Sequence, residues 1–247
     1  MDKPAYDSIG EIYEEYARTA PFKKVERHSM ATMIGPLNGE AAYDFACGSG
    51  YYSRLLKELG AGPVLGLDLS SEMVELAKRR EAENPLGIHY QTADCSQLEA
   101  MEPVPLVIAC WLLNNAPDEG VLRAMLVSAR RQLSPGGRFV GVTFNWNYQR
   151  EYYDFHKYGL VITEQDGGSP RRRIVGEFIT KVPTPAVEVY QWNQSTYETL
   201  FREAGFTALE WRPFSVSDQE KTDYGEEYWA ELEANCTGIG FVASCPK

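Results

Sequence analysis

Positive charge, signal-like segments and long apolar runs are all scarce in this chain of 247 residues. Lysine and arginine number 24 against 35 aspartate and glutamate residues, which gives a formal net charge of −11. Because a surface that grips phosphate backbones must be basic, general nucleic-acid binding is disfavoured. No apolar run is long enough to cross a bilayer, and the N-terminus lacks the charged-then-apolar layout of a secretory signal. We therefore expect a cytoplasmic protein that partners neither nucleic acid nor membrane.

Disulfides and metal ligands are poorly represented as well. The five cysteines are odd in number and contain no Cys-x-x-Cys pair, and the three histidines have no zinc-binding spacing. Reduced thiols and no metal site are therefore expected. The one basic cluster, Arg171-Arg172-Arg173, follows a Gly-Gly-Ser-Pro turn and is expected at the tip of a solvated hairpin, with an anion contact as the less favoured alternative.

The chain does contain short apolar runs that alternate with helical patterns between residues 41 and 144. The expected strands are 41–46, 63–67, 88–92, 106–110 and 138–144, with helices at about 51–59, 70–80 and 118–133. Strands that alternate with helices imply right-handed crossovers and a parallel sheet.

The alternation stops after residue 144. Strand-like pieces at 159–163, 174–180 and 187–192 predict an antiparallel insertion over the carboxyl ends of the parallel strands. A Ser-x-x-Glu pattern at Ser195 and Glu198 then predicts a capping box that opens a helix. The last two strands are expected at 207–214 and 238–243, with a helix at 226–232 between them.

Three features at the ends of the first three strands point to a nucleoside site. Residues 43–50, Tyr-Asp-Phe-Ala-Cys-Gly-Ser-Gly, place small residues where the backbone must approach a ligand closely. Asp68 closes the second strand, where a carboxylate can accept from both hydroxyls of a ribose. Asp94 follows the third strand, where it can accept from the exocyclic amine of an adenine. Such strand ends meet at the topological switch point, where open α/β sheets bind ligands.

These residues resemble the class I S-adenosylmethionine-dependent methyltransferase family. Its first motif, acidic-x-Gly-x-Gly-x-Gly, is matched by residues 44–50, with Ala46 in the place of the first glycine. Residues 66–70 match the second motif, 92–95 the third, and 133–137 the turn before the fifth strand. The resemblance implies S-adenosylmethionine as the cofactor. The cofactor-binding residues that it implies are Tyr13, Asp44, Ala46, Gly48, Gly50, Asp68, Leu69, Met73, Asp94, Cys95 and Cys110.

The resemblance also implies an architecture. We expect one α/β domain over 1–247, built on a Rossmann-like, seven-stranded, mostly parallel sheet whose last strand is antiparallel. A helical cap (1–35) and the insertion (145–192) would cover a nucleotide-binding core (41–144), and residues 193–247 would complete the sheet.

Looser similarities suggest a narrower group, the toxoflavin synthase-like small-molecule methyltransferases. They lie in residues 6–24, 110–117 and 224–229. This group implies a planar heteroaromatic acceptor that is methylated on nitrogen, with oxygen as the less favoured choice. We expect Tyr6 and Trp111 to form the two sides of the acceptor site, because an aromatic face at the end of the fourth strand can stack on a planar ring. Plain core packing is the alternative for both.

Other candidates and other functions stay open. Tyr13 is expected to contact the methionine end of the donor. Cys95 and Cys110 are expected to contribute to the site through their backbones. His28 and His156 could act as general bases, although a surface or helix-terminus role is favoured for each. Asp7, Glu164 and Tyr190 are further candidates for a base. The alternatives to methylation of a metabolite are a protein methyltransferase, a non-methylating member of the fold, and a nicotinamide enzyme, whose third fingerprint glycine is replaced by Ser53. The sequence specifies neither the acceptor nor the oligomeric state.

Overall fold

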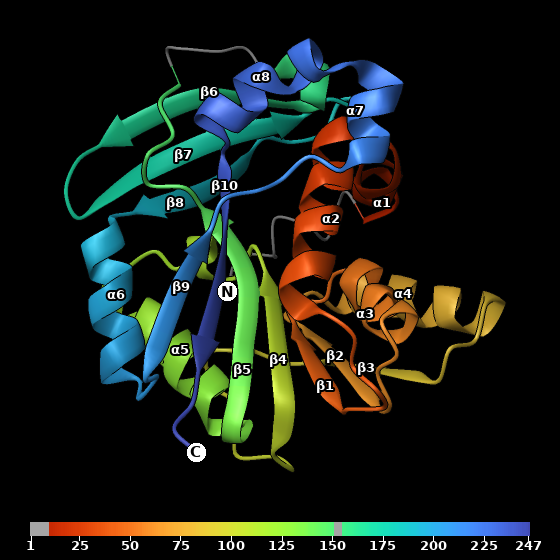
Figure 1. Cartoon of the computed structure of the whole chain (residues 1–247), viewed down its shortest axis with the longest axis vertical. Coiled ribbons are helices and arrows are strands. Elements are labelled where there is room, and N and C mark those ends of the chain that lie inside the picture. The colour runs from red at the N-terminus through yellow and green to blue at the C-terminus, as the bar shows by residue number, and fades with distance from the viewer. Residues whose placement is uncertain (1–9, 151–154) are drawn as a thin grey trace.

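The computed structural model describes residues 10–150 and 155–247. Seven strands form the main sheet in the order β3-β2-β1-β4-β5-β10-β9, and a second sheet has the order β6-β7-β8 (Figure 1). Strand β10 runs antiparallel to β5 and β9, whereas the other pairs of the main sheet are parallel, as predicted. The main-sheet strands are β1 (Ala42–Phe45), β2 (Val64–Asp68), β3 (Ile88–Thr92), β4 (Val104–Cys110), β5 (Leu133–Phe144), β9 (Ala208–Arg212) and β10 (Gly238–Ser244).

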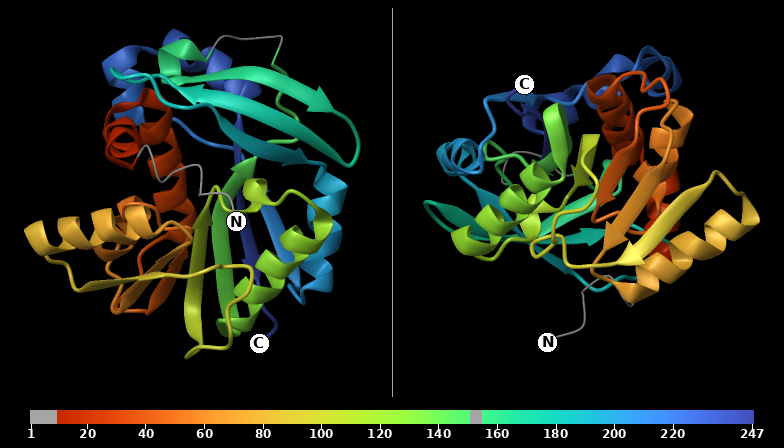
Figure 2. Two further views of the ribbon diagram at one scale, coloured as in Figure 1. Left: turned by 180° about the vertical axis from the view of Figure 1, so that it is seen from behind. Right: turned by 90° about the horizontal axis from the view of Figure 1, so that it is seen from below.

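Helices cover both faces of the main sheet (Figure 2). Helices α2 (Pro21–Ile34), α3 (Tyr51–Glu58) and α4 (Ser71–Glu83) share one buried apolar cluster with the sheet. Helices α5 (Glu119–Arg131) and α6 (Gln194–Glu203) share the cluster on the other face. Coverage on both sides buries all of β1, which explains why it is a continuous apolar run apart from Asp44.

The switch point lies between β1 and β4. Strand β1 pairs with β2 on one side and with β4 on the other, so the chain runs outward to β3 and then returns across β1. The turns that follow β1 and β4 therefore diverge and leave a crevice at the carboxyl ends of these strands. The ends of β1, β2 and β4 meet there, as the sequence predicted.

The insertion forms an antiparallel sheet at that same end of the molecule (Figure 1). Its strands are β6 (Leu160–Gly167), β7 (Arg171–Phe178) and β8 (Val187–Trp192). Helices α1 (Gly10–Thr19), α7 (Asp218–Tyr224) and α8 (Glu226–Asn235) lie beside it, and single turns of 3₁₀ helix occur at η1 (Leu113–Asn115) and η2 (His156–Tyr158). No helix in the described ranges combines the length and the apolar content that a membrane crossing requires.

Three local predictions were wrong. Helix α6 begins at Gln194 with Asn193 as its N-cap, and Glu198 accepts from Gln194 Nε2 at 2.8 Å instead of closing a capping box on Ser195. Strand β5 begins at Leu133, not 138, because Leu133 already pairs with Val104 of β4. Helix α7 was not anticipated, and α8 extends past the expected end at 232 to reach residue 235.

Candidate active site

The turn between β1 and α3 contains three residues with left-handed backbone. The φ angles are 57° at Ala46, 53° at Gly48 and 87° at Gly50. A Cβ atom at Gly50 would lie 2.3 Å from the Tyr90 hydroxyl oxygen, so only glycine fits there, whereas a Cβ at Gly48 would meet nothing within 4 Å. The backbone at Gly48 therefore faces open space. Ala46 adopts a conformation that costs an L-residue about 1–2 kcal/mol relative to glycine.

Asp68 connects this turn to the start of α4. Its Oδ2 accepts from the Gly48 N–H at 2.7 Å, and its Oδ1 accepts from the Ser70 N–H at 2.9 Å. Ser70 caps α4 by accepting from the Met73 N–H at 3.1 Å, as predicted. The half-buried carboxylate is thus held at the edge where β1 and β2 end.

Asp94 lies on the neighbouring strand end. The Ala93 N–H donates to the Asp68 backbone carbonyl at 2.8 Å, which brings the two strand ends together. The Asp94 carboxylate accepts from Ser96 through Oδ1 and from Gln97 Nε2 at 2.7 Å through Oδ2. The structure therefore assembles Gly48, Asp68 and Asp94 along one edge.

Asp44 faces inward from the same turn. Its side chain is buried, and its Oδ2 accepts from Ser53 Oγ of α3 at 2.6 Å. Burial, opposed by the Ser53 hydrogen bond and reinforced by the negative charge of Asp68, raises the pKa of Asp44 to about 7. Asp44 therefore joins β1 to α3 behind the turn and does not face the crevice surface.

The remaining predicted cofactor residues divide into exposed and buried positions. Leu69 is 59% exposed beside Asp68, so it offers an apolar surface at the crevice edge. Met73 is 1% exposed, and its sulfur lies near Gly10, between α4 and α1. The Cys95 thiol is buried near the Leu67 carbonyl, and burial raises its pKa to about 12. A thiol in that state stays protonated and inert.

Trp111 directly follows β4 and Cys110, with a left-handed φ of 62°. Its N–H donates to the Val142 carbonyl at 2.9 Å, which prolongs the sheet by one residue. A left-handed conformation is rare for a bulky residue and needs support from its surroundings. Here the indole Nε1 donates to Glu26 Oε2 at 2.9 Å, and the ring lies 6.1 Å from that of Phe22. Trp111 therefore projects from the strand end toward α2.

A buried polar cluster around Glu26 was missed in the sequence analysis. The Glu26 side chain is fully buried, and its Oε1 accepts from the Lys23 ammonium and the Tyr52 hydroxyl. Lys23 Nζ also lies 3.3 Å from Tyr52 Oη. The available signal was a pair of opposite charges three residues apart, on the helical stripe that also buries Val25. With Trp111, the cluster joins α2, α3 and the end of β4.

A partly open cavity of about 60 Å³ lies between α1, α2, Trp111 and the insertion sheet. Its walls are largely apolar, and the insertion supplies mostly aliphatic side chains. Lys23, Glu26 and Trp111 form one polar side, and Asn114 and Thr237 add two more polar groups. The aliphatic lining residues of the insertion are Leu160, Ile162, Ile174, Val187 and Val189.

Tyr13 links the cavity to the crevice edge. The ring lines the cavity and lies 5.1 Å from that of Phe178. Burial of the hydroxyl, together with the nearby Glu26, Cys110 and Asp68, raises the pKa of Tyr13. Its hydroxyl therefore lies within electrostatic reach of both the cavity and the strand ends. Tyr6, the other predicted wall of the acceptor site, and Asp7 lie outside the described residues.

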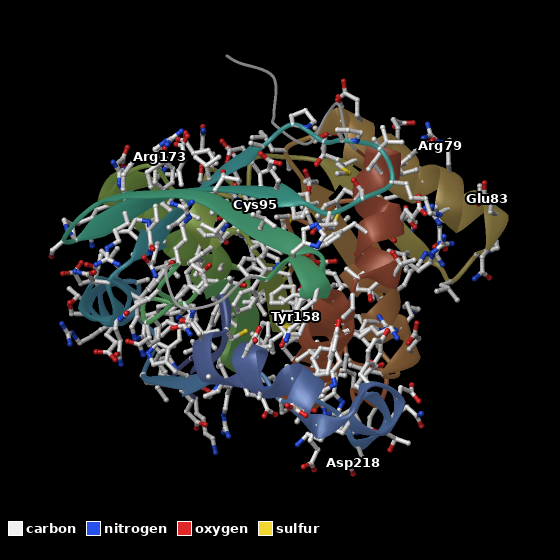
Figure 3. All side chains as sticks on the ribbon, turned by 90° about the horizontal axis from the view of Figure 1, so that it is seen from above. Arg79, Glu83, Cys95, Tyr158, Arg173 and Asp218 are labelled. Carbon is white, nitrogen blue, oxygen red and sulfur yellow. The ribbon has the colours of Figure 1, made fainter. Side chains whose placement is uncertain are left out.

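Most aromatic residues of the insertion do not line the cavity. Tyr158 stacks on Trp229 of α8 at 5.7 Å, and Trp192 donates to the Ala116 carbonyl, so both pack in the core. The basic cluster was expected at a hairpin tip, but it begins strand β7, where Arg173 pairs with Glu164, Asp166 and Glu188. Arg173 lies away from Tyr158 (Figure 3). Tyr152 and Tyr153 lie outside the described residues.

The candidate bases lie away from the cavity. His156 and Glu164 are exposed, and Tyr190 donates to Glu188 at 2.7 Å on the outer strand. His28 lines a surface groove beside Arg27 and Glu58. All five cysteines are buried free thiols. No cluster of three His, Cys, Asp or Glu side chains suited to a metal occurs within 10–150 and 155–247.

Comparisons with known proteins agree with this geometry. The model of a methyltransferase domain matches residues 42–137, the part that holds the crevice. A demethylmenaquinone methyltransferase of Lactococcus lactis is 28% identical over 222 residues, which cover 84% of this chain and 82% of that protein. A ubiquinone biosynthesis O-methyltransferase of Coxiella burnetii is 30% identical over 118 residues, so the match covers 47% of this chain and only about half (49%) of that relative.

The fold also matches solved structures. An S-adenosylmethionine-dependent methyltransferase from Mesorhizobium loti superimposes with a TM-score of 0.64 at 24% identity. The match covers 89% of this chain and 97% of that one. This match is longer than the domain matched at 42–137, so the similarity of fold extends beyond that domain.

Proposed function

Because this chain belongs to the class I S-adenosylmethionine-dependent methyltransferases, we propose that it methylates a small, planar aromatic or heteroaromatic metabolite. The methylated atom is a nitrogen, with oxygen as the second choice. The observation that carries this proposal is the small cavity beside Trp111, whose walls are largely apolar and whose polar groups are few. A macromolecular acceptor would need an open approach to the crevice.

The crevice residues fit the methyl donor. Gly48 has open space before its backbone, Asp68 offers a carboxylate for ribose hydroxyls, and Asp94 offers one for the adenine amine. The exposed Leu69 provides an apolar surface for the adenine ring. In this assignment Asp44 and Gly50 shape the turn, Ala46 adjoins the methionine part, and the backbones at Cys95 and Cys110 line the site. Met73, which is buried between α4 and α1, supports the donor site.

When bound, the donor supplies a methyl group on a positively charged sulfur. The chain provides alignment and a water-free path for its transfer, and such alignment accounts for most of the catalysis. Trp111 stacks on the acceptor ring and Tyr13 separates acceptor and donor sites.

Oxygen as the methylated atom is supported by one relative. The Coxiella burnetii protein carries O-methyltransferase in its name, and the Lactococcus lactis protein acts on demethylmenaquinone. Quinol rings are planar and carry two hydroxyl groups, so they agree with a largely apolar cavity that has a few polar groups.

The test is to incubate the protein with trideuteromethyl-labelled S-adenosylmethionine and separate metabolite, protein and RNA fractions of a bacterial extract. We expect label in one or a few small aromatic compounds, detected by mass spectrometry as a gain of the heavy methyl group. A Glu203→Gln variant, altered in an exposed ion pair between α5 and α6, serves as a control that should retain labelling. Label in protein or RNA alone would contradict a small-molecule acceptor, and no transfer to any fraction would favour a non-methylating role.

A further inference from the structure

The fully buried carboxylate of Glu26 has hydrogen-bonding capacity to spare on the side of the cavity. A carboxylate offers about four lone-pair positions. Oε1 uses two of them for Lys23 and Tyr52, whereas, among residues 10–150 and 155–247, Oε2 accepts from Trp111 Nε1 alone, at 2.9 Å. The remaining position is therefore on Oε2, the oxygen next to the residue that follows β4. Glu26 also lines the cavity, so a ligand there can reach this position.

Two further cavity groups lack partners. Asn114 Oδ1 and Thr237 Oγ1 are buried and have no hydrogen-bond partner within the described chain. Buried polar atoms are nearly always satisfied, so two orphans in one cavity point to a ligand that satisfies them. A plain hydrocarbon ring could not do so. The cavity therefore fits a ring with polar groups on more than one edge.

We propose that Glu26 is a catalytic residue: it accepts the hydrogen of the acceptor's N–H or O–H as that atom is methylated. The substrate class is thus a planar ring that carries an N–H or O–H nucleophile, together with a second polar group that bonds to Asn114 or Thr237. This inference rests on the proposed function, because it presumes that the cavity holds the methyl acceptor.

The step balances. A bond forms between the methyl carbon and the nucleophilic nitrogen or oxygen, while the carbon–sulfur bond breaks and its electron pair stays on sulfur. The N–H or O–H bond breaks, its electron pair stays on the nucleophile, and the proton moves to Glu26 Oε2. Glu26 returns the proton to solvent when the products leave. Lys23 and Tyr52 position the carboxylate through Oε1.

The Glu26→Gln substitution isolates this role. The Lys23 ammonium holds the amide oxygen of the new side chain in the Oε1 position, since the alternative places an NH₂ group against a cation. The NH₂ group then occupies the Oε2 position, where it can donate but not accept. Glu26→Asp keeps a carboxylate and should retain part of the ability to accept a hydrogen bond from the acceptor. Glu203→Gln, in an exposed ion pair between α5 and α6, is the matched control.

The probes are 7-hydroxycoumarin and its methyl ether, 7-methoxycoumarin, titrated by fluorescence into protein saturated with S-adenosylhomocysteine. The pH is kept where the hydroxyl probe is neutral. Wild type and Glu203→Gln should bind the hydroxyl probe at least tenfold more tightly than the ether, because only the former donates to Oε2. In Glu26→Gln the ratio should fall to within about threefold. Where Glu26→Gln fails to fold, Lys23→Gln/Glu26→Gln removes both charges together and should show the same loss.

An unchanged ratio in a folded Glu26 variant overturns the assignment, and so does equal binding of the two probes, or binding of neither, by wild type. Binding of S-adenosylhomocysteine is measured separately by calorimetry. If wild type does not bind S-adenosylhomocysteine, the donor site is refuted, and the proposed function with it. Normal donor binding without probe discrimination refutes only the role of Glu26.

Discussion

The buried carboxyl of Asp44 predicts a stability that falls as the pH rises. Its pKa is about 7 in the folded protein and near 3.8 in the unfolded chain, mainly because burial penalises the charged form. Between these two pH values Asp44 is protonated in the folded state but ionised in the unfolded chain. The free energy of unfolding therefore falls as the pH rises through this window. The penalty is fully developed only above the folded pKa.

The size of the effect follows from the two pKa values. Linkage gives a cost of roughly 1.5 kcal/mol at pH 5 and roughly 4 kcal/mol at pH 8, relative to acid conditions in which both states are protonated. Asp44→Asn has nearly the same shape, cannot ionise, and can still accept from Ser53 Oγ through its amide oxygen. The variant should therefore gain about 2–3 kcal/mol on wild type between pH 5 and pH 8.

The assay is urea unfolding of both proteins at the two pH values, followed by tryptophan fluorescence. Comparing the variant with wild type at each pH cancels the titration of other groups. The reasoning fails if the difference between the two proteins stays constant with pH, or if the variant loses ground as the pH rises. Either result would mean that Asp44 is ionised in the folded state at pH 5.

Three further predictions concern the crevice and the cap. Trp111→Ala should reduce methyl transfer to the labelled metabolite at least 100-fold, because alignment of the acceptor is lost. The affinity for S-adenosylhomocysteine should stay within a few-fold, because the nucleoside contacts remain. Loss of donor binding in calorimetry would make Trp111 a core residue. Ala46→Gly should raise the free energy of unfolding by about 1 kcal/mol in urea titrations, since glycine adopts a left-handed φ freely; destabilisation would contradict this. Peptides from α1 should exchange amide hydrogens more slowly when S-adenosylhomocysteine is bound, because Tyr13 of this helix is a predicted donor contact. Equal exchange would make α1 a fixed element.

The crevice could be predicted from the sequence because its parts are local. Small residues after a strand, a carboxylate at the next strand end and the βα alternation each depend on a few neighbouring residues. Gly48, Asp68 and Asp94 are brought together by the sheet order, which the alternation of strands and helices already implies. Even the open position at Gly48 follows from the motif.

The acceptor side could not be predicted in the same way. Glu26 resembles a surface helix residue in the sequence, and only the packing of α2 against α3 and Trp111 shows it to be buried. The insertion is rich in aromatic residues, but Tyr158 and Trp192 pack against α8 and η1 while mostly aliphatic residues of the insertion face the cavity. These contacts join segments 70 or more residues apart. Local patterns carry no information about them.

The same distinction explains the wrong helix start at α6. The Ser-x-x-Glu pattern is a local signal, but the Asn193 N–H donates to the Pro170 carbonyl of the insertion hairpin at 2.9 Å. This tertiary contact places the cap two residues before Ser195. Glu198 then bonds to Gln194 within the first turns of the helix.

The most direct test of the central claim is a calorimetric titration of S-adenosylhomocysteine into wild type, Asp68→Ala and the control Glu203→Gln. Wild type and the control should bind with micromolar affinity, about −8 kcal/mol, and show no comparable binding of NAD. Asp68→Ala should bind at least tenfold more weakly while its urea unfolding shows a folded protein, because the ribose contacts are lost. Wild-type affinity in folded Asp68→Ala, or tighter binding of NAD than of S-adenosylhomocysteine, would contradict the assignment of this crevice to the methyl donor.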